Sequence, residues 1–431
     1  MTKLLASLAF VLAGLAGRAL IDKLLALQGG AVAVAGWAQL SSLVDVVAGV
    51  SLMGVGTALT ALVAGSVGEE RAAWMKPALL LSLALSLAVT LVALPLLTWL
   101  DVAVVPVAAA LPMPPPGRPQ EAATLWGAAS RLCERGGPLL ALLVGWLAIG
   151  PGLLVAWLLG HAHPGRAALL VAAGFVPPLA LLLWGPLRLH WAGGALANLL
   201  LGQALFGLGM TAAMLLSLRG SPPLSREMLA TLLRFVPAGL AIGIMSPASL
   251  AWARAEIAAS LSWQAAGQVQ ALWRASEWIT LIMAGLLNAW SLPRLGAQLT
   301  RNGFVAELRR AARLVALPSA LLLALLWWWL PEVLALLYRE DLALSRRDAL
   351  FFFIGDWVRM MSWVALFGLF ARGAAWAIAV GECLSLPLFA GLLWLLAGHF
   401  GVKEIGMLWC ASYVAYAVFN VALLWRVLPG R

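Results

Sequence analysis

Long apolar runs recur from one end of the chain to the other, with short polar connections between them. A transmembrane α-helix needs about 20 mostly apolar residues, and runs of that length predict about twelve spans here. The expected spans lie near residues 4–28, 34–65, 77–100, 136–160, 167–187, 192–217, 231–257, 267–290, 312–331, 349–371, 374–397 and 405–428. The short alternating segments typical of a membrane β-barrel do not occur in the sequence. The pattern therefore predicts an all-α polytopic membrane protein.

Two regions outside these spans are less regular. Residues 101–135 are apolar but broken by prolines, which predicts an extended loop or a partly inserted end of the third helix. The basic segment at residues 294–313 is amphipathic, and we expect it to lie on the inner leaflet. Control of membrane topology alone also explains the charge of this segment.

The composition also indicates a membrane protein, since 63% of the 431 residues are hydrophobic and only 11% are charged. A soluble protein has about 25% charged residues. The formal net charge is +10, but most arginines and lysines fall between apolar runs, so we expect no nucleic-acid partner. The connections on one side of the membrane hold most of these basic residues. This asymmetry predicts that both termini lie in the cytoplasm.

No pattern typical of an enzyme occurs in the sequence. The chain lacks the G-x-x-x-x-G-K-[ST] pattern of nucleotide-binding loops, so we do not expect ATP to drive it. Three scattered cysteines and four histidines supply no convincing set of metal ligands. The sequence therefore predicts no enzymatic activity, no cofactor and no metal site.

A proline-containing connection, Arg219 to Glu227, lies between the sixth and seventh expected spans. It predicts two six-helix bundles, residues 1–219 and residues 220–431. A weak internal repeat agrees with this division, since a Gly-x-x-Gln pattern begins at Gly36 and again at Gly267. With an even number of helices in each half, both halves have the same orientation in the membrane.

Charged residues interrupt several of the expected spans. A charge at the centre of a membrane helix costs about 2.5–3.5 kcal/mol, so such residues usually face a cavity or a partner. Four of them, Arg254, Glu256, Arg274 and Glu277, lie in the stretch from Phe235 to Pro293. Arg274 and Glu277 have ion-pair spacing on one helix face, as do Asp356 and Arg359, so structural ion pairs also explain them.

The set as a whole looks net basic, which favours an anionic ligand. The planar guanidinium group matches the oxygens of phosphate, and a diphosphate is the membrane-relevant anion. Buried acids could carry protons or sodium ions in a transport cycle. The candidate diphosphate-binding residues are Arg254, Arg274, Arg359 and Lys23. The candidate ion-coupling or cavity acids are Asp45, Glu277, Asp356 and Glu382.

A series of short segments, in a fixed order, carries a resemblance to a known family. The segments are Asp22-Lys23-Leu24-Leu25-Ala26, WAQLSSLVDVVAG, LLRF, Ala253-Arg254, Ser262-Trp263, Gly355-Asp356-x-x-Arg359, Gly381-Glu382 and LLWRV. They resemble the Wzx-type polysaccharide flippases of the MOP (multidrug/oligosaccharidyl-lipid/polysaccharide) exporter superfamily. The likeness is greatest to the flippases of the enterobacterial common antigen lipid III, and it covers nearly the whole chain.

The resemblance implies a multi-pass protein of the bacterial inner membrane with twelve helices in two bundles. It implies that the protein moves an undecaprenyl-diphosphate-linked oligosaccharide, such as a repeat unit of O-antigen, common antigen or exopolysaccharide. The direction is from the cytoplasmic to the periplasmic leaflet, by ion-coupled alternating access. Membrane lipids, a polysaccharide polymerase and a chain-length regulator are the other implied partners. On this resemblance the family carries the same or similar charge at Lys23, Arg254, Glu277, Asp356, Arg359 and Glu382.

The chain departs from the family pattern at two positions. Ala58 stands where the family often has a lysine, and Arg274 is an addition. Two other functions also stay open. A multidrug or organic-cation antiporter of the same superfold would need an acidic or aromatic cavity. A membrane scaffold in a glycan-assembly complex would have little use for so many charges inside its spans.

Overall fold

The chain is helical throughout the part that the structure describes. The structure is a computed structural model, and it describes residues 2–66, 70–99, 120–184, 192–218, 225–234, 236–298, 300–338, 342, 344–372 and 374–428. Every regular element in these ranges is a helix. Eight helices of the described residues are long and apolar enough to cross a membrane, and a bent pair adds a ninth candidate. The prediction of an all-α polytopic membrane protein is confirmed.

The chain divides into two compact units, Met1–Ala251 and Trp252–Arg431. The division falls inside one helix, α9 (Val236–Ser260). The connection that marks the expected boundary between residues 219 and 220 lies outside the described residues, so that boundary stays a prediction.

The first unit opens with a helix long enough for two spans. α1 (Thr2–Val50) bends at Gly30, whose φ of 64° lies in the left-handed region that glycine adopts without a steric penalty. The π-helical η1 (Ser51–Gly56) and α2 (Thr57–Gly65) continue its second arm. The other helices of this unit before α9 are α3 (Glu70–Ala73), α4 (Met75–Trp99), α5 (Gln120–Gly160), α6 (Pro164–Trp184), α7 (Ala192–Ser217) and α8 (Arg226–Leu233).

Small residues let two helices of the first unit cross at close range. A Cβ atom added to Gly49 on α1 would lie 2.6 Å from the backbone oxygen of Gly243 on α9. Real Cβ atoms do not approach backbone oxygens so closely, so only glycine fits at position 49 without movement of a helix. In a membrane, close backbone approach of this kind is a principal source of helix–helix packing energy.

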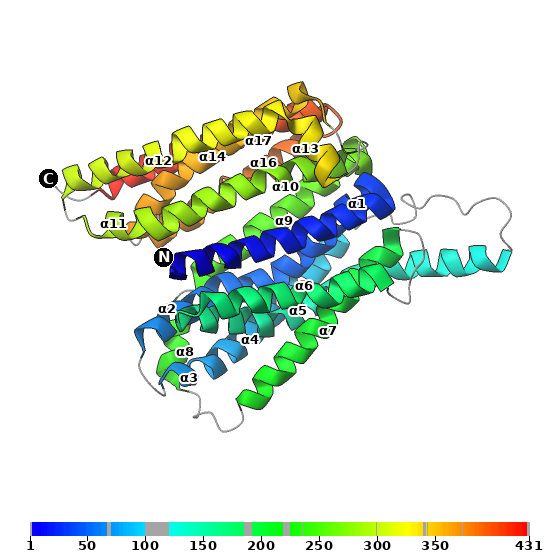
Figure 1. Cartoon of the computed structure of the whole chain (residues 1–431), viewed down its shortest axis with the longest axis horizontal. Helices are drawn as coiled ribbons and strands as arrows, with labels where there is room; N and C mark the ends of the chain where they lie inside the picture. The colour runs from blue at the N-terminus through cyan, green and yellow to red at the C-terminus, as the bar shows by residue number, and fades with distance from the viewer. Residues whose placement is uncertain are drawn as a thin grey trace. The chain divides into compact units, whose positions relative to one another are not determined.

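Among its described residues, the second unit continues from α9 into nine further helical elements. They are α10 (Trp263–Leu286), the π-helical η2 (Leu287–Ser291), α11 (Leu292–Gly296), α12 (Arg301–Trp328), α13 (Leu330–Leu337), α14 (Arg346–Ala371), α15 (Ala375–Cys383), α16 (Leu386–Leu395) and α17 (Val402–Arg426). α12 and α17 both pack along α14, and α14 with α17 forms the most extensive helix pair of this unit (Figure 1). The span expected at 374–397 is broken at Leu384 and Ser385, between α15 and α16.

The described helices correspond to the twelve expected spans, with α1 supplying two and α15 together with α16 supplying one. α9 and α10 are not among the eight apolar helices. α10 carries Gln264, Gln268, Gln270, Arg274 and Glu277, so its polarity marks it as a helix that needs polar partners within the membrane.

The expectation of an extended loop or partly inserted helix end over residues 101–135 is wrong in part. α5 begins at Gln120 rather than near residue 136, because the segment after Pro119 is rich in alanine and leucine and has no proline before Pro138. Residues 100–119 lie outside the described residues. In the basic segment at 294–313, residues 301–313 form the first turns of α12 and continue directly into its apolar part. The expectation that this segment lies on the inner leaflet stays a prediction.

Candidate functional site

The structure places the eight predicted site residues in two groups. Lys23 and Asp45 lie in the first unit, on the two arms of α1, with Lys23 partly buried and Asp45 exposed. The other six lie in the second unit, and most of them come together around α10 and α14. These six are Arg254, Arg274, Glu277, Asp356, Arg359 and Glu382.

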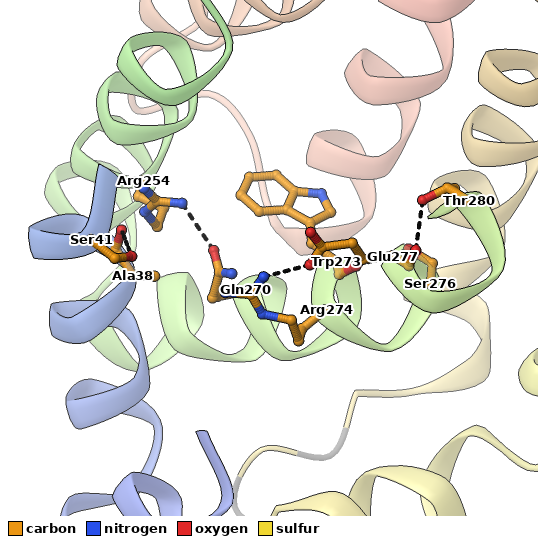
Figure 2. Close-up of polar contacts among 9 residues, drawn as sticks. All are labelled: Ala38, Ser41, Arg254, Gln270, Trp273, Arg274, Ser276, Glu277 and Thr280. Carbon is orange, nitrogen blue, oxygen red and sulfur yellow. Dashed lines mark hydrogen bonds and ion pairs between the residues drawn. The ribbon is translucent and has the colours of Figure 1, made fainter. Parts of the chain in front are cut away.

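Arg254 on α9 is held by a glutamine of the next helix. Its side chain is 2% exposed, and Nη1 donates a 2.9 Å hydrogen bond to Oε1 of Gln270 on α10. Figure 2 shows the two side chains directed toward each other from neighbouring helices. Gln270 ends the second Gly-x-x-Gln pattern of the sequence, and Gln39 ends the first. Gln39 is also buried and donates a 3.1 Å hydrogen bond to the backbone oxygen of Ala251, so each glutamine binds a residue of α9.

Arg274 and Glu277 form an ion pair within α10, between Nη1 and Oε2 (Figure 2). The spacing of three residues puts both side chains on one face of the helix, as the sequence predicted. The arginine side chain is 14% exposed and the glutamate side chain 27% exposed. This ion pair therefore has contact with solvent, unlike Arg254.

Asp356 and Arg359 form a second ion pair, one helical turn apart on α14, with 3.5 Å between Nη1 and Oδ1. The aspartate side chain is 1% exposed, and Trp409 Nε1 donates a 3.3 Å hydrogen bond to the same Oδ1. Its other oxygen, Oδ2, has no hydrogen-bond partner among the described residues. A buried carboxylate with so few partners depends on the arginine for compensation of its charge.

The guanidinium group of Arg359 rests against two aromatic rings. Its central carbon lies 4.9 Å from the ring centroid of Trp363 and 5.6 Å from that of Tyr413. Cation–π contacts at these distances stabilise the cation and fix the plane of the guanidinium group. The side chain is nevertheless 23% exposed, so Arg359 is less enclosed than Asp356. Arg359 also lies close enough to Glu277 and Glu382 for their charges to interact.

Behind these charges lies a buried aromatic cluster, which we define as Trp273, Phe352, Phe389, Trp409 and Tyr413. Trp409 is at its centre, with ring centroids 5.2 Å from Trp273, 5.1 Å from Phe389 and 4.9 Å from Tyr413. All five side chains are buried. The rings contact one another mostly in tilted or edge-to-face arrangements, so the cluster serves as a rigid support rather than as an open aromatic surface.

Glu382 is held at the broken helix rather than within an ion pair. The hydroxyl of Tyr416 on α17 donates a 2.9 Å hydrogen bond to Oε1 of Glu382, two residues before the break at Leu384. One turn further along α17, Asn420 is fully buried, and neither polar atom of its amide has a partner among the described residues. Its Oδ1 points at Gly381, where an added Cβ would lie 2.9 Å away. Buried polar atoms without partners are rare and often mark a site for water or an ion.

The six residues of the second unit balance in charge, with three arginines against three acids. The excess of positive charge expected from the sequence is therefore not found among them. The arrangement is an ion-pair network in which the side chains of Arg274 and Arg359 stay partly exposed, while Asp356 is enclosed. Such a network can exchange a carboxylate partner for a phosphate oxygen without a large change in its own net charge.

Sequence reasoning missed the residues that position these charges. Gln270, Trp363, Trp409, Tyr416 and Asn420 were not among the candidates. One signal was available, because the chain has three tyrosines and two of them, Tyr413 and Tyr416, share a helix face with Trp409 and Asn420. A stripe of that composition in an otherwise apolar span indicates a face that contacts polar partners.

Comparison with known proteins yields structural relatives only. No protein-family model matches the chain, and no curated protein matches it. Among solved structures, an inward-facing multidrug-resistance MATE-family transporter of the MOP superfamily is similar, with a TM-score of 0.67 at 16% identity. The similarity covers 97% of this chain and 95% of that one. The chain therefore shares the fold of this transporter structure.

Two further structures with this fold are similar over their whole length. A MOP-superfamily transporter from Pyrococcus furiosus aligns with a TM-score of 0.62 at 15% identity, over 99% of this chain and 94% of that one. An outward-facing multidrug-resistance MATE-family transporter aligns with a TM-score of 0.60 at 15% identity, over 98% and 96%. At these identities the similarity establishes the fold, and the substrate has to be inferred from the residues of this chain.

Proposed function

We propose that the protein is a transporter that works by alternating access. Solved structures with the same fold include transporters in inward-facing and outward-facing conformations. The polar helices α9 and α10 support this proposal, because charged residues in a membrane-spanning helix are costly unless they serve a transport path or a partner.

We infer that the substrate is a lipid-linked oligosaccharide, joined through a diphosphate to an undecaprenyl chain. The observation that carries this inference is the state of Arg359. Two aromatic rings and Asp356 fix its guanidinium group, yet 23% of its side chain stays exposed. A fixed, partly exposed guanidinium group presents paired donors in the geometry that phosphate oxygens accept. Arg274, with its own exposed edge, would add donors of the same kind.

In this mechanism the lipid tail stays in the bilayer while the polar headgroup crosses along the polar faces of α9, α10 and α14. Arg254, Arg274, Arg359 and Lys23 would bind the diphosphate. The acids Asp45, Glu277, Asp356 and Glu382 would take up and release a proton or a sodium ion, which couples transport to an ion gradient. The transport direction would be from the cytoplasmic to the periplasmic leaflet of the bacterial inner membrane.

The orientation of the protein belongs to the same proposal. One end of the second unit holds Arg294, Arg301, Arg309, Arg310, Arg313, Arg372 and Arg426 against the single acid Glu307 among its described residues. An excess of arginine marks the cytoplasmic side of membrane proteins, which would place the C-terminus in the cytoplasm and the N-terminus with it. A polysaccharide polymerase and a chain-length regulator would then act on the product at the periplasmic side.

A multidrug or organic-cation antiporter is the second candidate, because two of the similar structures are multidrug-resistance transporters. The residues of this chain favour it less. An organic cation needs an exposed acid or an open aromatic face, and the aromatic cluster here is buried. Of the acids in the second unit, Asp356 is enclosed and the partly exposed Glu277 is paired with Arg274. The structure from Pyrococcus furiosus is described as having a binding pocket of reverse polarity that suggests a different function. The fold is therefore compatible with more than one substrate class.

Depletion of the protein in its own host separates the two candidates. Polyprenyl-diphosphate lipids would be extracted and identified by mass spectrometry, and drug susceptibility would be measured in the same cells. A flippase predicts that a glycosylated polyprenyl-diphosphate lipid accumulates and that drug susceptibility stays unchanged. Normal lipid pools together with drug hypersensitivity would contradict the flippase proposal and support the antiporter.

A further inference from the structure

One face of α12 passes from arginine to leucine within a single helical turn. Arg309, Arg313, Leu317 and Leu321 follow one another at intervals of four residues, so they form a continuous stripe along the helix. Both arginines are exposed. Leu317 is 78% exposed and Leu321 61% exposed, which is the state expected of side chains that face lipid tails.

The position of the stripe fixes the depth of the arginines. At a rise of about 1.5 Å per residue, Arg313 lies about 6 Å along the helix axis from Leu317. This distance is similar to the thickness of the headgroup layer of a bilayer. When Leu317 lies among the acyl chains, the arginines therefore lie among the headgroups. Arg309 and Arg313, which we call the α12 arginine pair, lie on the lipid side of the helix at headgroup depth.

The single acid among the described residues at this end of the unit already has ion-pair partners. Glu307 is buried on the opposite side of α12, with one carboxylate oxygen 3.6 Å from Arg294 and the other 2.9 Å from Arg310. Within the described residues neither member of the α12 arginine pair forms an ion pair. Arg313 Nε donates a 3.4 Å hydrogen bond to the backbone oxygen of Arg309. Two like charges four residues apart on a helix destabilise it slightly, and a bound anion would relieve this repulsion.

The surrounding surface reinforces the positive potential. Leu295, Phe304, Leu369 and Leu424 share one apolar core, which brings the start of α12 together with the ends of α14 and α17. This end of the unit therefore carries the excess of arginine described above. The opposite end is balanced among its described residues, with Arg346, Arg347 and Lys403 against Glu332, Asp348 and Glu404.

We propose that the α12 arginine pair binds the phosphate groups of anionic membrane lipids. Guanidinium groups bind phosphate oxygens through paired hydrogen bonds, and clusters of arginine beside a transmembrane helix attract anionic headgroups. The lipid source, rather than free phosphate, follows from the leucines that continue the stripe into the bilayer. This inference concerns the membrane surface of the protein and does not rest on the proposed transport function.

The test is lipid binding to the purified full-length protein in a neutral detergent, measured by native mass spectrometry with phosphatidylglycerol. The double variant Arg309→Gln/Arg313→Gln removes the pair, and both positions are exposed, so we expect it to fold normally. Each arginine near an anionic surface strengthens binding about fivefold, so the loss of two should weaken phosphatidylglycerol binding roughly 25-fold. Binding of zwitterionic phosphatidylcholine should not change.

A matched control removes two exposed charges from the opposite end of the same unit, in Arg347→Gln/Lys403→Gln. This variant should bind phosphatidylglycerol within about twofold of the wild type, because the lost charges lie away from the pair. Equal binding by the two double variants would overturn the proposal. Displacement of the lipid by an equal concentration of inorganic phosphate would also overturn it, since the pair would then recognise phosphate without the lipid.

Discussion

The hydroxyl of Tyr416 donates a 2.9 Å hydrogen bond to the carboxylate of Glu382, which joins α17 to the C-terminal end of α15 beside the break in that span. Broken membrane helices leave backbone groups and nearby side chains without regular partners, so they often hold ions. The contact links the predicted coupling acid to a helix that sequence reasoning had not associated with it.

Replacement of Glu382 tests its proposed role in coupling. Glu382→Gln keeps the size of the side chain and an acceptor for Tyr416, but it can neither bind a proton nor carry a negative charge. We expect transport to lose its dependence on the imposed ion gradient, measured with lipid-linked glycan in proteoliposomes at two values of external pH and sodium. Tyr416→Phe keeps the acid and should retain that dependence. If the ion dependence is unchanged in Glu382→Gln, Glu382 does not couple transport to the ion gradient and has only a structural role.

Arg359 should contribute differently to transport and to stability, and two substitutions separate these effects. Arg359→Lys keeps a charge for Asp356 but loses the planar fork, so transport should fall about tenfold or more while membrane abundance stays near normal. Arg359→Ala leaves Asp356 buried and uncompensated, at a cost of about 3–5 kcal/mol in the free energy of unfolding.

The double variant Asp356→Asn/Arg359→Gln is the control for this pair. It removes both charges, so abundance and thermal stability should recover relative to Arg359→Ala, whereas transport should stay low. Recovery of transport in the double variant would show that Arg359 serves only to neutralise Asp356.

Substitutions of Arg254 and of its partner Gln270 likewise separate an effect on transport from an effect on stability. Arg254→Ala should strongly reduce glycan export, measured as accumulation of the lipid-linked intermediate in cells. Gln270→Leu keeps the arginine but removes its acceptor, which should lower the free energy of unfolding by about 1.5–3 kcal/mol, the range for hydrogen bonds to charged groups. Unchanged export in Arg254→Ala would remove this arginine from the site.

The amide of Asn420, which has no hydrogen-bond partner among the described residues, should be a source of instability. Replacement by leucine, of similar size, removes two buried polar atoms without partners, each of which costs about 1–3 kcal/mol. We therefore expect Asn420→Leu to raise the thermal unfolding temperature of the detergent-solubilised protein. At Asn198 one buried amide atom, Oδ1, lacks a partner among the described residues, so Asn198→Leu should raise the unfolding temperature less. A lower unfolding temperature for Asn420→Leu would indicate that a water molecule or an ion completes the site beside Glu382.

The crossing of α1 and α9 predicts a position-specific effect of a single methyl group. Gly49→Ala places a Cβ against the Gly243 backbone, which the helices can accept only by moving apart, and such overpacking costs about 1–3 kcal/mol. Gly285 on α10 has open space around it, so Gly285→Ala should be neutral or stabilising by up to about 1 kcal/mol. Thermal unfolding of both variants measures the difference. Equal stability would contradict the close crossing.

The sequence by itself determined the helices and the local ion pairs. In lipid, backbone N–H and C=O groups must form their hydrogen bonds within each helix. A long apolar run therefore forms a helical span, and the positions of the spans follow from the positions of these runs. The pairs Arg274–Glu277 and Asp356–Arg359 are three residues apart, and helical geometry alone puts each pair on one face. The expectation for residues 101–135 was less accurate, because prolines before residue 120 gave no information on where α5 begins.

Only the tertiary structure decided which helices share a polar contact. Tyr416 and Glu382 are 34 residues apart, and Trp409 and Asp356 are 53 apart, so no local spacing connects them. Their contacts depend on which face each helix turns toward its neighbour, and side chains from several helices determine that rotation together. The same is true of the close approach of Gly49 to Gly243. The sequence shows where each helix lies and which residues share a face of it. The rotation of one helix against another depends on the packing of all the helices together, so it cannot be read from one segment.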